Sequence, residues 1–211
     1  MTRAKTFILA ILLVGVCTGM AMAQPTIHGP QSGILGPGTY LVDGNLTVEA
    51  GNSLTVVPGT TLLFAGHFSF KIYGTLNAVG TENDSILFVR QRPNSNCEWS
   101  GLRFMAGATA NSVVSYALFD GARYQVWPDY YGGAISTNVP VAISHCSILN
   151  CYASSGGGLY INNVNSGTVT LTNCIIMNNS AGNGGAIYIY NCSATVVVSN
   201  NAIARNSSTS T

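Results

Sequence analysis

Residues 124–131 hold four aromatic side chains and one acid, and this makes them the first candidates for ligand chemistry. Exposed aromatic rings beside an acid can stack on sugar rings or anchor a protein partner. Alternatively, the rings cover an end or a flank of the fold. The ligand-binding residues predicted here are Tyr124, Trp127, Asp129, Tyr130 and Tyr131.

Catalytic acids and bases are scarce in this chain. Glycoside hydrolysis needs two carboxylates roughly 5 to 9.5 Å apart, and lyase chemistry needs a base together with acids or calcium. Positions 130 to 211 contain no Asp, Glu or Lys. The acids that could approach one another across a repeat are Glu98, Asp120 and Asp129, with Arg103 and Arg123 nearby. We interpret them as solvated loop charges and predict no catalytic residue.

A histidine and a cysteine stand next to each other at His145 and Cys146. Neighbours in a strand point to opposite faces, and neither residue has an acid nearby in sequence, which favours structural roles. The cysteines that follow position 23 are odd in number and lack the CxxC spacing of a zinc site. They are Cys97, Cys146, Cys151, Cys174 and Cys192. We predict no metal and no cofactor.

The elements that must position these residues form an internal repeat. A Gly-Gly motif at 132–135 recurs at 157–160 and 184–187, and each copy precedes a β-rich run and an apolar-x-x-Asn element. Those elements end at Asn150, Asn178 and Asn206. In the first half, short runs such as 46–48, 54–56 and 62–64 repeat at 70–72, 76–78 and 86–88, with turn signals between them.

Three short strands in each 22 to 28 residues predict an all-β solenoid. Alternate residues of a strand point inward, so Leu46, Val48, Leu62 and Phe64 are expected in the core. Successive coils must stack at ~4.8 Å to bury their apolar sides. Because Asn tolerates the left-handed conformation of a tight bend, we predict that Asn150, Asn178 and Asn206 are vertical neighbours. Cys146 and Cys174 are expected to stack inward as buried free thiols.

The Gly-Gly motif followed by the apolar-x-x-Asn element resembles the GG[AI]/FxxN repeats of polymorphic outer-membrane proteins of the bacterial cell surface. The Phe position holds Ser147, Ile175 and Ile203, a relaxed form of that pattern. The resemblance covers about residues 40–206. It implies a right-handed parallel β-helix of the pectate-lyase-like type, here with about six coils of three strands. Longer members continue to an anchoring or sorting domain, so we expect the domain at 24–211 to be truncated at its C-terminus.

The first 23 residues read as a secretory signal peptide. Arg3 and Lys5 precede an apolar stretch at 7–16, and an Ala-x-Ala site ends at Ala23. This predicts export, and with the resemblance it predicts a secreted, cell-surface or outer-membrane location in a bacterium. Only 7% of the residues are charged, without clustered cations, which excludes a nucleic-acid footprint and a polybasic membrane patch. The mature segment is not expected to insert into a membrane.

These patterns favour a non-enzymatic solenoid for adhesion or for contact with a surface glycan or another protein. An alternative is a fragment of a polysaccharide lyase or hydrolase whose catalytic coils are missing. A third hypothesis, an ice-binding face prompted by the threonines of 168–172, is weakened because the neighbouring repeats place Val and Ala there. The sequence alone names neither the ligand nor the oligomeric state.

Overall fold

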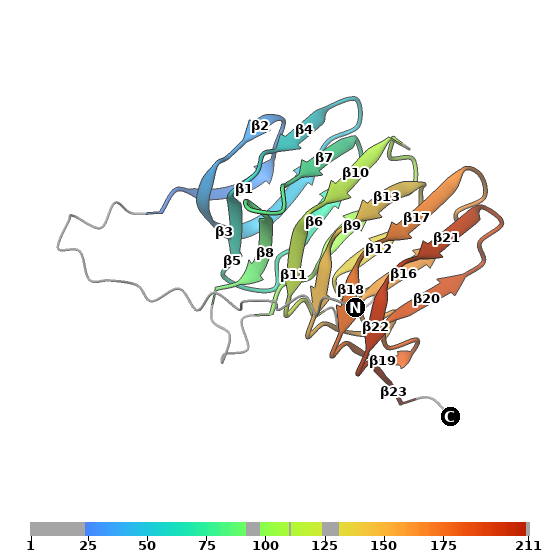
Figure 1. The fold of residues 1–211 in the computed structure, drawn as a ribbon. Helices are drawn as coiled ribbons and strands as arrows, with labels where there is room; N and C mark the ends of the chain where they lie inside the picture. The colour runs from blue at the N-terminus through green and yellow to red at the C-terminus, as the bar shows by residue number, and fades with distance from the viewer. Residues whose placement is uncertain (1–23, 92–97, 110, 124–130, 210–211) are drawn as a thin grey trace, which may run out of the picture.

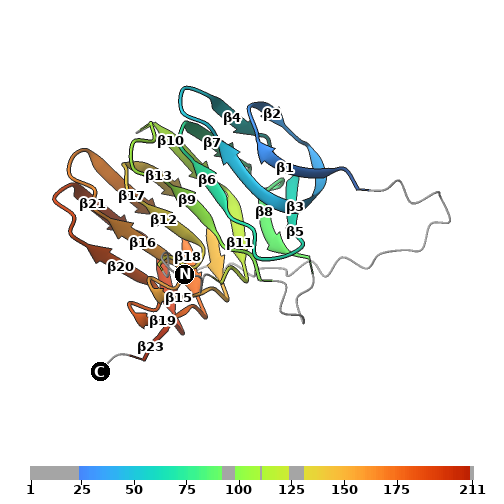
Figure 2. The ribbon, with the colours of Figure 1, turned by 180° about the vertical axis from the view of Figure 1, so that it is seen from behind.

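The chain folds entirely into parallel β-structure within the described residues. The computed structural model describes residues 24–91, 98–109, 111–123 and 131–209. Its strands form sheets of 13, 7 and 3 strands, and every strand pair is parallel. The all-β prediction is therefore confirmed. Figures 1 and 2 show the strands lying side by side in rows that run from the N-terminal to the C-terminal end.

The strands fall into three sheets. The largest contains β1 (Thr26–Pro30), β3 (Gly38–Val48), β5 (Thr60–Phe64), β6 (Phe70–Ile72), β8 (Ile86–Arg90), β9 (Leu102–Phe104), β11 (Ala117–Asp120), β12 (Ile135–Thr137), β14 (Ser147–Leu149), β16 (Leu159–Asn162), β18 (Ile175–Met177), β20 (Ile187–Tyr190) and β22 (Ala202–Ala204). The second contains β2 (Gly33–Leu35), β4 (Ser53–Val56), β7 (Thr75–Val79), β10 (Ser112–Ser115), β13 (Val141–Ser144), β17 (Thr168–Thr172) and β21 (Thr195–Ser199). The third contains β15 (Tyr152–Ser155), β19 (Ser180–Asn183) and β23 (Ser207–Ser208).

The largest sheet turns around its longest strand. The first half of β3 pairs with β5, and its second half pairs with β6. Two arms result: β6-β9-β12-β16-β20 on one side and β5-β8-β11-β14-β18-β22 on the other. The second sheet, β2-β4-β7-β10-β13-β17-β21, adds a third row. Consecutive strands of the chain thus go to different rows, and each row collects one strand from every repeat.

Alternating burial explains why these segments become strands. In β5 the pattern is buried at Thr60, Leu62 and Phe64 and intermediate at the residues between them. Leu46 and Val48 are also fully buried, so the inward positions predicted from the alternation are confirmed. Part of the core is a stack of nearly parallel rings, in which the Trp99 ring lies 4.4 Å from that of Phe64 and 6.3 Å from those of Phe88 and Phe119.

The predicted asparagine row is only partly correct. Asn150 and Asn178 occupy equivalent bends with φ of 56° and 57°, as expected for the left-handed conformation. The third member is Arg205, with φ of 55°, because Met177 pairs with Ala204. Asn206 is therefore displaced by one residue, and the prediction for it was wrong: the last repeat is 27 residues long rather than 28.

Asn206 belongs instead to an inner row with Cys151 and Asn179. The Asn206 Oδ1 accepts from the Asn179 N–H at 2.9 Å, and the Asn179 Oδ1 accepts from the Cys151 N–H at 2.9 Å. A second inner row joins Cys146 and Cys174, both buried and free, so the expectation of stacked thiols is confirmed. Equivalent residues of successive repeats therefore do stack, and among the asparagines and cysteines predicted to stack only Asn206 lies one position away from its expected row.

One of the three Gly-Gly motifs, the copy at 157–160, aligns one residue away from the predicted register, whereas 132–135 and 184–187 match as predicted. Ile135 pairs with Leu159 and Leu159 with Ile187. Gly133 therefore corresponds to Gly157 and Gly185, whereas the sequence alignment had equated Gly133 with Gly158. A Cβ at Gly133 would overlap the carbonyl oxygen of Gly157. Only glycine permits this approach between neighbouring strands.

Candidate ligand-binding groove

The structure describes one of the five predicted ligand-binding residues. Tyr131 forms an isolated parallel bridge with Ser155, and its side chain is 42% exposed. The remaining four, Tyr124, Trp127, Asp129 and Tyr130, lie outside the described residues. Tyr131 therefore fixes where the aromatic segment returns to the sheets, beside the β12-β16-β20 arm.

Tyr131 begins a ladder of four tyrosines. Its ring lies 4.9 Å from that of Tyr160, which lies 5.9 Å from Tyr188, and Tyr188 lies 6.5 Å from Tyr190. The rings are nearly parallel, with interplanar angles of 10° to 18°. The sheet sets this arrangement, because Tyr160 and Tyr188 are register partners in β16 and β20.

The members of the tyrosine ladder differ in exposure. Tyr160 is 4% exposed, whereas Tyr190 is 55% exposed. Burial raises the pKa of Tyr160 to about 12, and the neighbouring tyrosines add to the shift. Its hydroxyl therefore stays protonated at neutral pH and remains available as a hydrogen-bond donor. Because the rings cover one another's faces, the ladder presents mainly ring edges and hydroxyl groups between its two exposed ends.

Two outward columns of side chains contain Tyr160, Tyr188 and Tyr190 of the ladder and extend it toward β6. Lys71, Arg103, Ser136, Tyr160 and Tyr188 are successive register partners across five strands. The second column stands two residues further along the chain, at the end of a strand or just past it. It comprises Met105, Asn138, Asn162 and Tyr190.

The groove between these columns is large enough for a small ligand. Its cavity at the tyrosine end has a volume of about 380 Å³, and the lining adds the amides of Asn163 and Asn183 to the tyrosines. A second, smaller cavity of about 80 Å³ shares Tyr131, Tyr160 and Asn162 with the first, and its lining adds Lys71, Arg103 and Asn138. We call this feature the β6–β20 groove. Ligand pockets commonly enclose 300–1,000 Å³.

Arg103 ties the aromatic segment to β9. Its Nη1 donates to the carbonyl of Tyr131 at 2.7 Å and also to that of Gly132. Its Nε donates to the carbonyl of Ser100 at 2.8 Å. The side chain is only 6% exposed. The sequence had placed Arg103 near Glu98, Asp120 and Asp129, and the hydrogen bonds described here give it a positioning role in the groove.

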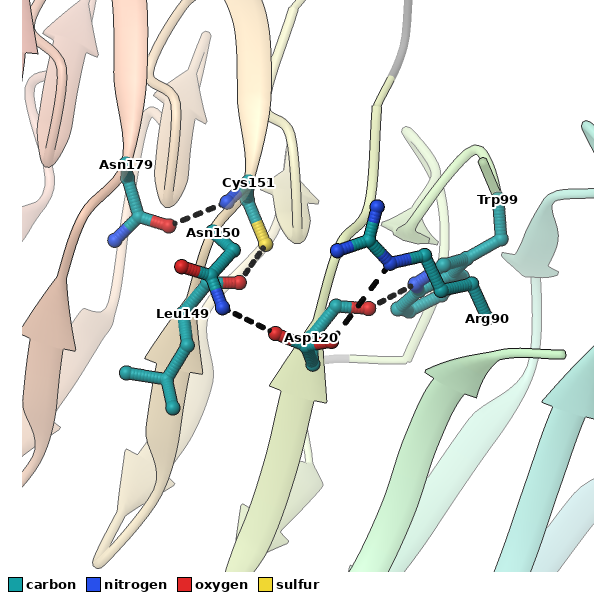
Figure 3. A network of polar contacts seen from close by, with 7 residues as sticks. All are labelled: Arg90, Trp99, Asp120, Leu149, Asn150, Cys151 and Asn179. Atoms are coloured by element: carbon teal, nitrogen blue, oxygen red, sulfur yellow. Dashed lines mark hydrogen bonds and ion pairs between the residues drawn. The ribbon is translucent and has the colours of Figure 1, made fainter. Parts of the chain in front are cut away.

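The described members of that acidic cluster, Glu98 and Asp120, each lie beside an arginine, and Figure 3 shows the contacts of Asp120. Asp120 accepts from the Asn150 amide at 2.6 Å and lies 3.8 Å from Arg90 Nε. Its backbone carbonyl accepts from the Trp99 indole at 3.0 Å. Glu98 pairs with Arg123 at 2.8 Å. Asp129 lies outside the described residues. This arrangement braces the bend after β11, and both carboxylates are engaged.

Cys146 points into the core and has no nucleophilic environment. Its thiol donates to the carbonyls of Ser144 at 3.2 Å and Val114 at 3.7 Å. The contact with the Cys174 side chain and burial raise the pKa of Cys146 well above its usual value. Burial likewise raises the pKa of Cys151 to about 12. These groups remain thiols at neutral pH, as expected for structural cysteines.

His145 faces outward at the opposite corner of the fold. Its ring stacks on Tyr116 with centroids 4.6 Å apart. The surrounding hollow also contains Glu82, an acid far away in sequence. Sequence reasoning missed this neighbour because the two residues come from different repeats.

Sequence reasoning also missed Tyr160, Tyr188 and Asn162. The two tyrosines follow the Gly-Gly motifs at the same offset, but the one-residue error in aligning the motifs hid the match. Across the described segments, no group of three or more His, Cys, Asp or Glu side chains could hold a metal ion. No helix in that part of the chain is long and apolar enough to cross a membrane.

Comparisons with known proteins give no relative for this chain. No protein-family model matches it, and no match was found among curated proteins or among solved structures.

Proposed function

We propose that this protein is a secreted or surface-exposed, non-enzymatic solenoid that makes adhesive contact with a glycan through the β6–β20 groove. The architecture proposed with it is a right-handed parallel β-helix of about six coils, each with three short strands. The parallel rows of strands support this architecture. The resemblance of the repeats to bacterial surface proteins and the signal-like residues 1–23 support the location.

The single observation that carries the binding proposal is the tyrosine ladder. The rings of Tyr160, Tyr188 and Tyr190 stand on the paired strands β16 and β20 and are held in place before a ligand arrives, so little ordering is needed on binding. Tyr131 and Tyr190 offer exposed rings, and Asn162, Asn163 and Asn183 offer amides beside them. Apolar rings combined with a few hydrogen-bonding groups suit sugars, which present both C–H faces and hydroxyl groups.

The alternative is a fragment of a polysaccharide lyase or hydrolase. The described residues that line the groove include no carboxylate, whereas hydrolysis of a glycosidic bond uses two. The described acids Glu98 and Asp120 serve instead as partners of Arg123 and Arg90. Contact without catalysis is therefore the better supported function.

A glycan array probed with the full chain and with Tyr131→Ala and Tyr190→Ala tests the proposal. The wild-type protein should bind a subset of glycans, and each variant should weaken that binding about 3- to 10-fold, the worth of one aromatic contact. Tyr116→Asn is the matched control. It removes a tyrosine outside the groove, from a row of left-handed bends where Asn173 and Asn200 already stand.

Circular dichroism should show that all three variants retain the wild-type fold. Binding that survives both groove substitutions, or that is lost equally in the control, would exclude the groove as the contact site. A product released from any bound glycan would favour the enzyme alternative.

A further inference from the structure

The β6–β20 groove changes its chemistry along its length. At the β6 and β9 end, Lys71 and Arg103 are register partners. At the other end, Tyr160 and Tyr188 are register partners, and Ser136 lies between the two pairs. Neighbouring strands are about 4.8 Å apart, so the two cations belong to adjacent steps of one column.

We propose that the groove takes an anionic glycan, with carboxylate or sulfate groups toward Lys71 and sugar rings toward the tyrosines. This inference rests on the proposed function, since it names the substrate class of the same groove.

Charge at the Lys71 end is the first support for this inference. Among the described residues, no carboxylate lies within ion-pair distance of the Lys71 ammonium group. Glu49 accepts a hydrogen bond from Thr47 at 2.7 Å, and Thr47 is the register partner of Lys71 on the side away from Arg103. The two cations therefore occupy adjacent steps of the column between the uncharged residues Thr47 and Ser136.

The two cations have different parts in this arrangement. The hydrogen bonds from Arg103 to the carbonyls of Ser100, Tyr131 and Gly132 fix its guanidinium beneath the groove. Lys71 is half-buried on the outward face, and its flexible stem can bring the ammonium group to an acidic substituent. Lys71 is therefore the group that meets the anion, and Arg103 links the cationic end to the backbone that carries Tyr131.

An unsatisfied acceptor is the second support, and it is independent of charge. The Asn162 Oδ1 is buried and has no hydrogen-bond partner within the described segments. Asn162 lines both parts of the groove, and its backbone carbonyl accepts from the Asn138 amide at 3.0 Å. A buried acceptor without a donor is costly, and a sugar hydroxyl would supply the missing donor after a small rotation of the amide.

The position of the groove favours a glycan over an acidic peptide. Peptides that dock on sheets commonly add a strand to an open edge. The cationic end lies on the outer face of β6, β9 and β12, each paired on both sides. The cationic end of the groove therefore offers side chains rather than free backbone groups to its ligand.

Titration calorimetry on the full chain tests this inference with matched pairs of polymers. The pairs are polygalacturonate with its methyl ester and dextran sulfate with dextran, so that carboxylate and sulfate are examined separately. At least one anionic polymer should bind more tightly than its neutral counterpart, and added salt should reduce this difference in affinity.

Lys71→Ala should lower the ratio of anionic to neutral affinity about 3- to 10-fold. Lys71→Arg should restore the ratio, and Arg205→Asn, a cation removed outside the groove, should leave it unchanged.

The outcomes separate this inference from the proposed function. Equal affinity for anionic and neutral polymers, with Tyr131→Ala weakening both, would overturn the anionic preference and leave glycan contact standing. An unchanged ratio in Lys71→Ala would also overturn it. Polyglutamate bound as tightly as the anionic glycans would show that the groove selects an acidic peptide instead. Failure of every polysaccharide to bind would overturn both ideas.

Discussion

Two adjacent asparagines, Asn178 and Asn179, have different structural roles in this fold. Asn178 adopts a left-handed conformation with φ of 57° and turns the chain at a bend. Asn179 is completely buried and points inward. Its Nδ2 donates to the carbonyl of Ile148 at 3.0 Å, and its Oδ1 accepts from the Cys151 N–H at 2.9 Å. One amide side chain thus satisfies backbone groups of the neighbouring repeat.

Replacing the inner asparagine should therefore cost more than replacing the outer one. We expect Asn179→Ala to lower the free energy of unfolding by about 2 kcal/mol, because a buried N–H loses its acceptor. Asn178→Gly is the matched control, since Gly121 stands in the same row of bends with φ of 66°. Its effect should stay within about 0.5 kcal/mol. Urea denaturation followed by circular dichroism measures both, and equal losses would contradict the assignment of roles.

The sequence predicted the bend residues better than the inner row. Asparagine tolerates the left-handed conformation, and this property was enough to place Asn150 and Asn178. The inner row escaped notice because its first member is Cys151, whose chemical type gives no hint of a shared position with Asn179. The regular 28-residue spacing then led to the wrong prediction that Asn206 stands in the row of Asn150 and Asn178. A change of one residue in repeat length cannot be read from spacing alone.

The Gly-Gly motifs, which precede strands, allow the backbones of neighbouring repeats to come into direct contact. A Cβ at Gly157 would overlap the carbonyl oxygens of Gly185 and Ser180. Gly157 has an ordinary φ, so the requirement for glycine comes from space and not from conformation. These contacts fix the exact height at which β16 and β20 stack, and with it the spacing of Tyr160 and Tyr188.

Gly157→Ala should consequently destabilise the protein by about 1–3 kcal/mol, because rigid backbone would have to move to admit one methyl group. Gly66→Ala offers a control, since the atoms nearest to its added Cβ belong to the side chain of Phe68, at 3.3 Å, and not to rigid backbone. That substitution should change stability by less than about 0.5 kcal/mol. Thermal unfolding of the two variants provides the measurement, and similar melting temperatures would argue against close backbone packing at Gly157.

Strand positions were predictable because alternating burial leaves a direct trace in the sequence, as at 46–48 and 62–64. The candidate groove was harder to predict. Tyr131 was identified from its aromatic segment. To predict that Tyr160 is its partner, one must first know which two of the three consecutive glycines at 156–158 align with the other Gly-Gly motifs. Only the pairing of Leu159 with Ile135 settles that register. Lys71 lines the same groove as the tyrosines only because four further strands stack beside β6. Local sequence patterns do not predict that stacking.

At the scale of the molecule, the core is not uniform from one end to the other. The stacked rings of Phe64, Phe88, Trp99 and Phe119 fill the repeats of the first half. Later inward positions hold smaller residues such as Ile148 and Ile176. In the last repeat, burial falls sharply: all three residues of β22 are exposed, and Ile203 is 45% exposed.

This gradient predicts unequal local stability within the chain. Amide hydrogens of β20 to β22 should exchange at least roughly tenfold faster than those of β7 and β10, because few buried contacts oppose opening of the last repeat. Hydrogen exchange read by mass spectrometry resolves these segments. The tyrosine ladder spans strands that differ in burial. Tyr160 lies on the well-buried β16, and Tyr190 lies at the exposed end of β20. A bound glycan should therefore slow exchange in β20 more than in β16. Equal protection of all strands in the free protein would instead show that the repeats open as one cooperative unit.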